Sequence, residues 1–341
     1  MHPNTEQYDD HQSRDSFRKP KSARRTLLKD DGDLPEGLIS GTVTAVMGNS
    51  FVVESHEGDC GEVECVAAGT MISSHQRATI IAVGDRVFYT LTDNSGENIG
   101  TISRLEERRN VLSRQAVHIQ EKEHVIASNI DKLLIFCSAS DPIYNVKLID
   151  RYLVTAELNS ITPIICVNKT DLFFSKEMEQ DFDIYKELGI PVYFLSVKKN
   201  SGIEPVIAEL TDSVSVLSGP SGAGKSTLLN KVLGVEYQTV QDISNRTSKG
   251  MHTTSAARMF SLPSIRCRII DTPGIREFGI FGLEKEELSL YFHDFDKFAG
   301  DCRFQPCTHL HEPGCAVMAA LEAGLINPIR YESYLNIYDS L

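Results

Sequence analysis

Gly219-Pro-Ser-Gly-Ala-Gly-Lys-Ser226 is the stretch of sequence that decides the fold class. It follows an apolar run at 213–217 and opens a helical pattern at 225–233. Glycines at this spacing let backbone N–H groups turn inward around phosphate oxygens, and the helix N-terminus adds a favourable dipole. The stretch therefore predicts a nucleotide-binding P-loop between a strand and a helix of an α/β domain.

Two side chains of this loop have specific predicted roles. Lys225 is expected to reach the β- and γ-phosphates, and the Ser226 hydroxyl is expected to bind Mg²⁺. The predicted nucleotide contacts of the loop are Gly219, Pro220, Ser221, Gly222, Ala223, Gly224, Lys225, Ser226 and Thr227.

A P-loop alone does not choose between ATP and GTP, but a second motif does. Asn168-Lys-Thr-Asp171 follows a strand-like run at 161–167. The carboxylate of Asp171 accepts two hydrogen bonds from guanine N1–H and the 2-amino group, which adenine does not offer, so the wrong base leaves polar groups unpaired. We call Asn168, Lys169, Thr170 and Asp171 the guanine loop. Ser196, Val197 and Lys198, after the run at 191–195, are placed to supply the last base contacts.

Asp271-Thr-Pro-Gly274 follows a third apolar run, at 265–270. A carboxylate at this place is expected to hold the Mg²⁺ shell, and the N–H of Gly274 is expected to sense the γ-phosphate. The next residue is Ile275, where many GTPases use a glutamine to position the attacking water. Its side chain forms no hydrogen bond, so another group has to orient that water.

A predicted switch segment, Gly250-Met-His-Thr-Thr254, lies between the P-loop and Asp271. Either Thr253 or Thr254 closes on Mg²⁺ and the γ-phosphate, and spacing does not decide between them. His252 is the natural candidate to orient the water, although a lone histidine is often structural or merely exposed. Because the preceding stretch is polar, we expect slow intrinsic turnover and hydrolysis stimulated by a partner.

After Arg109 the sequence alternates strand-like runs with helical stretches. The runs are 132–137, 161–167, 191–195, 213–217 and 266–270, and the helical stretches are 145–159, 175–188, 203–210 and 225–233. Alternation of this kind predicts a largely parallel sheet with helices on both faces and ligands at the carboxyl ends of the strands. The P-loop, the guanine loop and the Asp271 motif each follow one of these runs.

The sequence before Arg109 has a different pattern. Residues 1–35 are polar and charged and are predicted to be disordered, either as a solubilising tail or as a basic arm for RNA phosphates. Residues 36–108 contain short strand-like runs at 41–47, 50–54, 78–83 and 86–91, typical of a small barrel such as an OB-fold. This segment carries four arginines against eleven acids, so RNA contact there would depend on local patches.

Three cysteines and two histidines crowd together near the C-terminus. Cys302, Cys307 and Cys315 fit a tetrahedral structural Zn²⁺ site with one imidazole, which spacing allows to be His309 or His311. The remaining five cysteines are scattered, as expected for buried thiols in a reducing cytosol. A helical pattern follows at 317–338.

The order of the motifs carries a family resemblance. GTPases commonly have the P-loop first and the guanine loop last, whereas here the guanine loop lies about fifty residues before the P-loop. The same sheet forms if the chain enters it at a different strand. The chain therefore resembles the circularly permuted GTPases, and over roughly residues 36–330 its layout is similar to the RsgA (YjeQ, EngC) family of small-ribosomal-subunit-dependent GTPases.

Together these observations predict a multidomain protein. The expected parts are a disordered, partly basic tail at 1–35, an all-β OB-fold barrel at 36–108, a circularly permuted α/β P-loop GTPase domain at 109–282 and a mostly α zinc-binding module at 283–341. The resemblance implies that Cys302, Cys307, His309 and Cys315 bind the zinc ion, and it also points to His252 as the catalytic histidine.

By the same resemblance, the protein is a GTP hydrolase that binds the small (30S) ribosomal subunit, through 16S rRNA and neighbouring ribosomal proteins, during late maturation. The implied cofactors are GTP or GDP, Mg²⁺ and one structural Zn²⁺. The absence of an apolar segment at the N-terminus or of membrane-span length predicts a cytoplasmic protein without membrane partners. A net charge of −13 argues against wholesale nucleic-acid binding, and we expect no DNA partner. A monomer is the simplest expectation.

Two other functions fit part of the pattern. The acidic barrel favours a signalling or transport GTPase with protein-binding flanking modules. Ile275 favours a zinc-bearing RNA-binding protein that holds the nucleotide without hydrolysing it.

Overall fold

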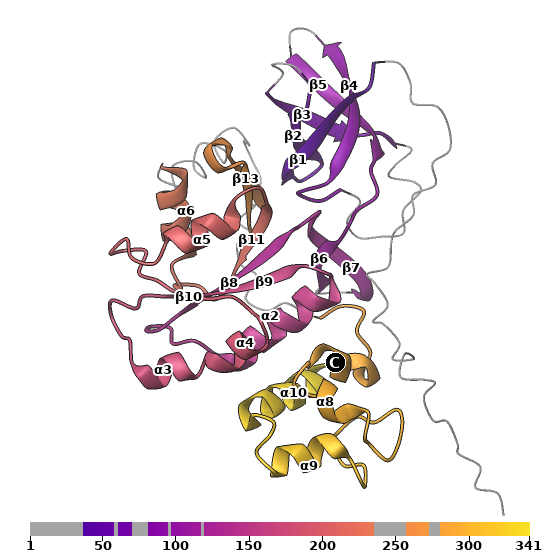
Figure 1. The fold of residues 1–341 in the computed structure, drawn as a ribbon. Coiled ribbons are helices and arrows are strands. Elements are labelled where there is room, and N and C mark those ends of the chain that lie inside the picture. The colour runs from indigo at the N-terminus through magenta and orange to yellow at the C-terminus, as the bar shows by residue number, and fades with distance from the viewer. Residues whose placement is uncertain are drawn as a thin grey trace, which may run out of the picture.

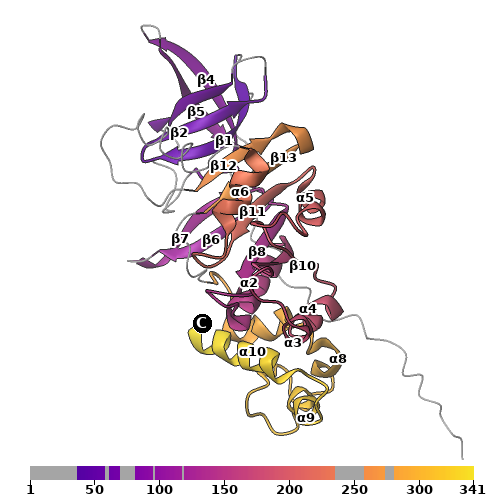
Figure 2. The same cartoon turned by 90° about the vertical axis from the view of Figure 1, so that its left-hand side faces the viewer.

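The computed structural model describes residues 37–57, 61–69, 81–94, 97–116, 119–234, 257–272 and 280–341. Figures 1 and 2 show three parts in a row, with an N-terminal barrel at one end, a sheet with helices in the middle and a small helical module at the other end. Among the described residues, no helix combines the length and hydropathy needed to cross a membrane.

Five strands close into the N-terminal barrel. They are β1 (Ile39–Met47), β2 (Ser50–Ser55), β3 (Glu62–Ala67), β4 (Arg86–Asn94) and β5 (Glu97–Leu105). Their order is β1-β2-β3-β5-β4, and an additional pairing between β4 and β1 closes the ring. Alternate residues of each strand point inward, and Val43, Val53 and Tyr89 are fully buried in the barrel core. The prediction of a small N-terminal barrel is confirmed.

One predicted strand of the barrel lies partly outside the described residues. Of the run at 78–83, residues 81–83 are described, and there Val83 makes only an isolated bridge to Ala127. Ile81 packs in the barrel core and Val83 in the core of the central sheet, so the described end of this run lies where the two parts meet.

The central sheet contains the strands that precede the nucleotide motifs. They are β8 (Lys132–Ser138), β9 (Thr162–Asn168), β10 (Val192–Phe194), β11 (Val214–Ser218), β12 (Arg258–Leu262) and β13 (Cys267–Asp271), in the order β10-β9-β8-β11-β13-β12. All neighbours pair in parallel except β12 and β13, which are antiparallel. A short 3-10 turn, η1 (Pro263–Ile265), joins these last two strands.

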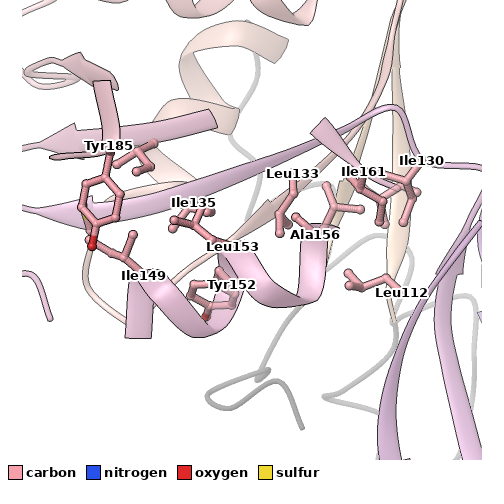
Figure 3. Close-up of a cluster of buried hydrophobic side chains, with 14 of the residues drawn as sticks. Leu112, Ile130, Leu133, Ile135, Ile149, Tyr152, Leu153, Ala156, Ile161 and Tyr185 are labelled. Atoms are coloured by element: carbon pink, nitrogen blue, oxygen red, sulfur yellow. The ribbon is translucent and has the colours of Figure 1, made fainter. Parts of the chain in front are cut away.

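Helices cover both faces of this sheet, as its sequence predicts. They are α2 (Val146–Leu158), α3 (Lys176–Gln180), α4 (Asp183–Glu187), α5 (Glu204–Leu210) and α6 (Lys225–Leu233). Successive side chains of β8 point to opposite faces, so Leu133 and Ile135 pack under α2 and α4 while Leu134 and Phe136 pack under α5 and α6. Figure 3 shows the first of these clusters, with Tyr152 of α2 and Tyr185 of α4 against the sheet.

Two elements differ from the sequence prediction. The single helix expected at 175–188 is two short helices, α3 and α4, which are separated by a turn at Asp181 and Phe182. The α/β pattern after Arg109 also missed a hairpin of β6 (Val111–Ala116) and β7 (Ile119–Ser128). Its residues lead from the barrel into β8.

A buried ion pair holds the barrel to this hairpin. Asp85, which is 0% exposed, accepts hydrogen bonds from Nε and Nη2 of Arg108, both at 2.7 Å, and from Ser128 Oγ at 2.6 Å. The backbone N–H of Ala82 donates to the same carboxylate at 2.7 Å. The carboxylate therefore joins the loop before β4 to the end of β7.

Replacing Asp85 by Ala leaves the buried Arg108 guanidinium without its carboxylate. We expect Asp85→Ala to destabilise the protein by about 3–5 kcal/mol, measured by urea unfolding. Arg86→Ala is the matched control, because its pair with Glu106 is exposed and 3.9 Å long, and it is expected to change stability by less than about 0.5 kcal/mol. Equal stability of the two variants would contradict the assignment.

The C-terminal module consists of short helices that pack on α2. They are η2 (Lys285–Tyr291), α8 (Asp296–Ala299), α9 (Ala316–Glu322) and α10 (Pro328–Ser340). Arg330 of α10 is 3% exposed and donates hydrogen bonds to Asp150 of α2 and to Asp294, the latter through Nη2 at 2.7 Å. Tyr185 of α4 donates to the same Asp150 at 2.8 Å. The predicted mostly helical module is thus anchored on the central sheet.

Candidate nucleotide site and metal centre

The P-loop connects β11, in the middle of the sheet, to the N-terminus of α6. Gly219 has φ +144°, and a Cβ there would lie 1.9 Å from the carbonyl oxygen of Phe136. Gly224 has φ +103°, and a Cβ there would lie 2.2 Å from the side-chain nitrogen of Asn168. Only glycine fits at these positions, so the loop stays close to the neighbouring strands with its backbone free to surround phosphates.

Lys225 lies folded over the loop that precedes it. Its Nζ donates hydrogen bonds to the carbonyl oxygens of Gly219 at 2.7 Å and Pro220 at 2.8 Å. Burial lowers the pKa of this ammonium group, and the charge of Asp271 partly opposes that effect. Phosphate oxygens would replace the two carbonyls as acceptors for the same ammonium. Ser226 and Thr227, in the first turn of α6, are exposed.

Asn168 joins the guanine loop to the P-loop. Its Nδ2 donates to the carbonyl oxygen of Ala223 at 2.8 Å, and its Oδ1 accepts from the backbone N–H of Val197 at 3.0 Å. The side chain is 3% exposed, and both its amide nitrogen and its amide oxygen form hydrogen bonds. One amide therefore fixes the distance between the phosphate loop and the two loops expected to hold the base.

Asp171 lies at the edge of the site, and one of its carboxylate oxygens accepts a hydrogen bond within the protein. Ser196 Oγ donates to its Oδ1 at 2.5 Å, and Ser196 Oγ itself accepts from the backbone N–H of Lys199 at 3.1 Å. The hydrogen bond from Ser196 is the main reason why the pKa of Asp171 is lowered, with nearby Lys198 and Lys199 adding to the shift. The carboxylate is thus held ionised and oriented.

The other two residues of the guanine loop form hydrogen bonds to the loops that follow β8 and β10. Lys169 has a left-handed backbone, with φ 64°, and its Nζ donates to the carbonyl oxygen of Asp141. The N–H of Thr170 donates to the carbonyl oxygen of Leu195 at 3.3 Å. These contacts bring the ends of β8, β9 and β10 to one edge of the site.

Asp271 ends β13, directly beside the P-loop strand. It is paired in register with Leu217 of β11 and is 6% exposed, which places the carboxylate near the start of the P-loop. The structure thus brings together Asp271, the P-loop, the guanine loop and the Ser196–Lys198 turn. The predicted residues His252, Thr253, Thr254 and Gly274, together with Ile275, lie outside the described residues.

The three crowded cysteines meet His309 in a buried cluster. The ligand atoms of Cys302, Cys307, His309 and Cys315 all lie within 4.8 Å of one another. Cys302 Sγ is 3.8 Å from Cys315 Sγ and 3.6 Å from His309 Nδ1, and Cys315 Sγ is 3.4 Å from the same nitrogen. His311, the alternative that spacing left open, is exposed and is not part of the cluster.

These separations match a zinc site. A tetrahedral ion with Zn–S bonds of about 2.3 Å and a Zn–N bond of about 2.0–2.1 Å sets its ligand atoms about 3.5–3.8 Å apart. Three thiols and one imidazole, all buried, are also the donor set that suits structural zinc. The spacing of Cys302, His309 and Cys315 and the donor set of all four side chains therefore suit one Zn²⁺ ion.

Side chains that the sequence analysis did not single out hold this loop in place. Glu312 accepts hydrogen bonds from the backbone N–H groups of Thr308 at 2.8 Å and Leu310 at 3.0 Å, and these bonds lower the pKa of its carboxyl group against the opposing effect of burial. Tyr331 of α10 donates to the carbonyl oxygen of His309 at 2.7 Å. The bond from Tyr331 is a tertiary contact with α10, whereas the bonds of Glu312 lie within the ligand loop itself.

The guanine loop precedes the P-loop along the chain, and the Asn168 side chain joins the two loops. This arrangement defines a circularly permuted P-loop GTPase. Comparison with protein families gives the particular family. The RsgA GTPase family matches residues 105–281, and the chain belongs to that family.

Curated relatives share most of the chain. The small ribosomal subunit biogenesis GTPase RsgA of Chlorobaculum parvum is 42% identical over 308 residues, which cover 89% of this chain and 98% of the relative. The protein of the same name from Flavobacterium johnsoniae is 38% identical over 305 residues, covering 88% of this chain and 93% of the relative.

Solved structures agree with this assignment. YjeQ from Thermotoga maritima superposes with a TM-score of 0.68 at 28% sequence identity, covering 89% of this chain and 98% of that one. YloQ, described as a circularly permuted GTPase, superposes with a TM-score of 0.64 at 26% identity, covering 90% of this chain and 97% of that one. The permuted order of motifs predicted from the sequence is confirmed.

Proposed function

We propose that this protein hydrolyses GTP in the biogenesis of the small ribosomal subunit, acting in the cytoplasm as a monomer. The observation that carries the nucleotide assignment is the Asn168 side chain, which joins the guanine loop to the P-loop through Ala223. The names of the curated relatives support the ribosomal role.

Each predicted side chain has a role in this proposal. The backbone N–H groups of residues 219–227, except Pro220, surround the phosphates, and Lys225 donates to the β- and γ-phosphate oxygens. Asp171 accepts from the guanine N1–H and 2-amino groups, while Ser196, Val197 and Lys198 flank the base. Ser226, Asp271 and Thr254 or Thr253 hold Mg²⁺, which neutralises developing charge on the phosphates.

Hydrolysis needs a positioned water more than covalent chemistry. His252 orients this water, since Ile275 has no side-chain donor or acceptor. The four side chains Cys302, Cys307, His309 and Cys315 hold one structural Zn²⁺, which supplies no chemistry to the reaction because its four ligands leave no open position.

The flanking parts provide the contacts with the partner. In this proposal the barrel (36–108) and the zinc module (283–341) dock on 16S rRNA and neighbouring ribosomal proteins in late maturation of the 30S subunit. Hydrolysis of GTP by the GTPase domain (109–282) acts as the timer of this step. RNA phosphate contacts lose affinity steeply as salt increases, so binding to 30S particles at rising salt distinguishes RNA contact from a protein-only interface.

GTP hydrolysis measured alone, with 30S subunits and with 50S subunits tests the proposal. We expect 30S subunits alone to raise kcat by at least about tenfold, and His252→Ala to remove that increase, since a positioned group acting on the water contributes about 10²–10⁴-fold. His311→Ala, an exposed histidine outside the metal cluster, is the control and should behave like the unmodified protein.

Equal rates with and without 30S subunits would overturn the ribosomal assignment and favour a signalling or transport switch. A stimulated rate that survives His252→Ala would overturn only the role of this histidine.

A further inference from the structure

The barrel and the central sheet are one continuous sheet, joined where β1 pairs with β12. Ala45 of β1 is the register partner of Arg258 of β12, and Arg258 is in turn the register partner of Asp271 of β13. A single residue therefore separates a barrel strand from the predicted magnesium ligand. Figure 2 shows β12 and β13 beside β1 at this junction.

One carboxylate of the barrel reaches both of these strands. Glu54, in β2, accepts from Nη2 of Arg268 in β13 at 2.7 Å through one oxygen. Its other oxygen accepts from the hydroxyl of Ser261 in β12 at 3.3 Å. The two contacts span sequence separations of 214 and 207 residues, so only the folded arrangement of barrel and sheet creates them.

The two strands lead to the predicted catalytic segments. β12 begins at Arg258, four residues after Thr254 in the sequence, and β13 ends at Asp271. β13 also pairs with β11, the strand that enters the P-loop. A change in how the barrel holds β12 and β13 is thus transmitted by backbone hydrogen bonds to groups expected around the γ-phosphate.

The ion pair itself is too exposed to be a major source of stability. The Arg268 and Glu54 side chains are 35% and 30% exposed, and pairs of this kind are weakened by solvent screening. The pair nevertheless fixes the position of both strands relative to the barrel, because one carboxylate bonds to each of them.

We propose that Glu54 is a positioning residue for GTP hydrolysis, through which the 30S subunit, bound to the barrel, controls β12 and the strand β13 that ends at Asp271. The inference rests on the proposed function for the identity of the partner. It rests on the hydrogen bonds of Glu54 for the way in which the barrel is coupled to β12 and β13. Glu54 touches neither substrate nor metal and acts only through β12 and β13.

Charge exchange across the Glu54–Arg268 pair tests the proposal. Glu54→Arg and Arg268→Glu are each expected to lower the 30S-stimulated kcat by about tenfold, and the intrinsic kcat by a smaller factor of about three. The KM for GTP and the Kd for 30S subunits should stay within about twofold, because neither the base site nor the outer barrel surface is altered. The double variant, which restores the pair with its charges exchanged, should recover most of the lost rate.

Arg266 and Asp212 provide the matched control. They form an ion pair of similar length, with Nη2 and Oδ2 2.8 Å apart, at the start of β13 but within the central part of the protein. Asp212→Arg and Arg266→Glu should leave both the intrinsic and the stimulated kcat unchanged.

Two results would overturn the role of Glu54. One is an unchanged kcat in both single variants, and the other is a double variant as slow as the single ones. If 30S subunits do not stimulate the unmodified protein, the proposed partner is wrong. The role of Glu54 is then decided by whether the single variants lose intrinsic kcat and the double variant recovers it. Because unfolded protein lowers the apparent kcat without changing KM, each kcat is divided by the folded fraction measured by circular dichroism. A loss of kcat that disappears after this division would also count against the proposal.

Discussion

Asp171→Asn is expected to convert this protein from a guanine-nucleotide binder into one that prefers xanthine nucleotides. The carboxylate has one oxygen held by Ser196 Oγ at 2.5 Å and is exposed toward the base site. Guanine offers it two donors, N1–H and the 2-amino group. An amide at this position places an NH₂ donor against the 2-amino group, so a good contact becomes a clash of donors.

The expected loss of GTP affinity is about 10²- to 10³-fold, since two hydrogen bonds to a charged group are replaced by one neutral contact. Xanthine has a carbonyl oxygen where guanine has its amino group, so XTP should bind the variant about as well as GTP binds the unmodified protein. Fluorescent nucleotide titration with GTP, XTP and ATP measures these affinities.

Asp183→Asn is the matched control, because the Asp183 side chain is 51% exposed and lies at the start of α4, where it pairs with Lys186. It should retain the original preference for GTP. An Asp171→Asn variant whose GTP affinity stays within about threefold would show that another group recognises the base.

The nucleotide motifs could be located from sequence because each is a local pattern. A buried apolar run predicts a strand, and the glycines or the Asn168–Asp171 tetrapeptide after it predict a loop at its carboxyl end. A parallel sheet brings the carboxyl ends of its strands to one edge, so these loops are then expected to lie together. The structure shows this arrangement at the ends of β9, β11 and β13.

The junctions between the parts could not be predicted in the same way. The Asp85–Arg108–Ser128 group joins residues separated by up to 43 positions, and the Glu54 contacts span more than two hundred. No local periodicity marks a residue for such a contact. The β6–β7 hairpin was missed for a related reason, since its polar, partly charged segment lacks the apolar run that indicates a strand in the neighbouring sheet.

Spacing also left the choice between His309 and His311 open, and backbone shape separates them. His309 has φ 59°, a conformation that few non-glycine residues adopt, and its carbonyl is held by Tyr331. The N–H of His311 donates to Glu312 at 3.2 Å, which turns this residue toward solvent. The bond from Tyr331 joins His309 to α10, and neither this bond nor the one to Glu312 is visible in a ligand-spacing pattern.

The zinc cluster gives the second large expected effect. Purified protein should contain about one zinc per chain, and His309→Ala should lower zinc affinity by at least about 10²-fold, more than the loss of a supporting hydrogen bond. His311→Ala should keep the full zinc content. Zinc content by mass spectrometry and affinity by competition with a chelator provide the two measurements.

Loss of the metal should also release the C-terminal module. Cys302, Cys307 and Cys315 belong to the same buried cluster as Phe295 and Tyr334, so the ligand loop is part of the hydrophobic core of this module. Without the ion, binding free energy that contributes to folding is lost, and limited proteolysis should cleave first within this module. Asp150 and Arg330 still anchor α10 on α2, so the central sheet should keep its affinity for GTP. A His309→Ala protein with full zinc, or a His311→Ala protein without it, would reverse the ligand assignment.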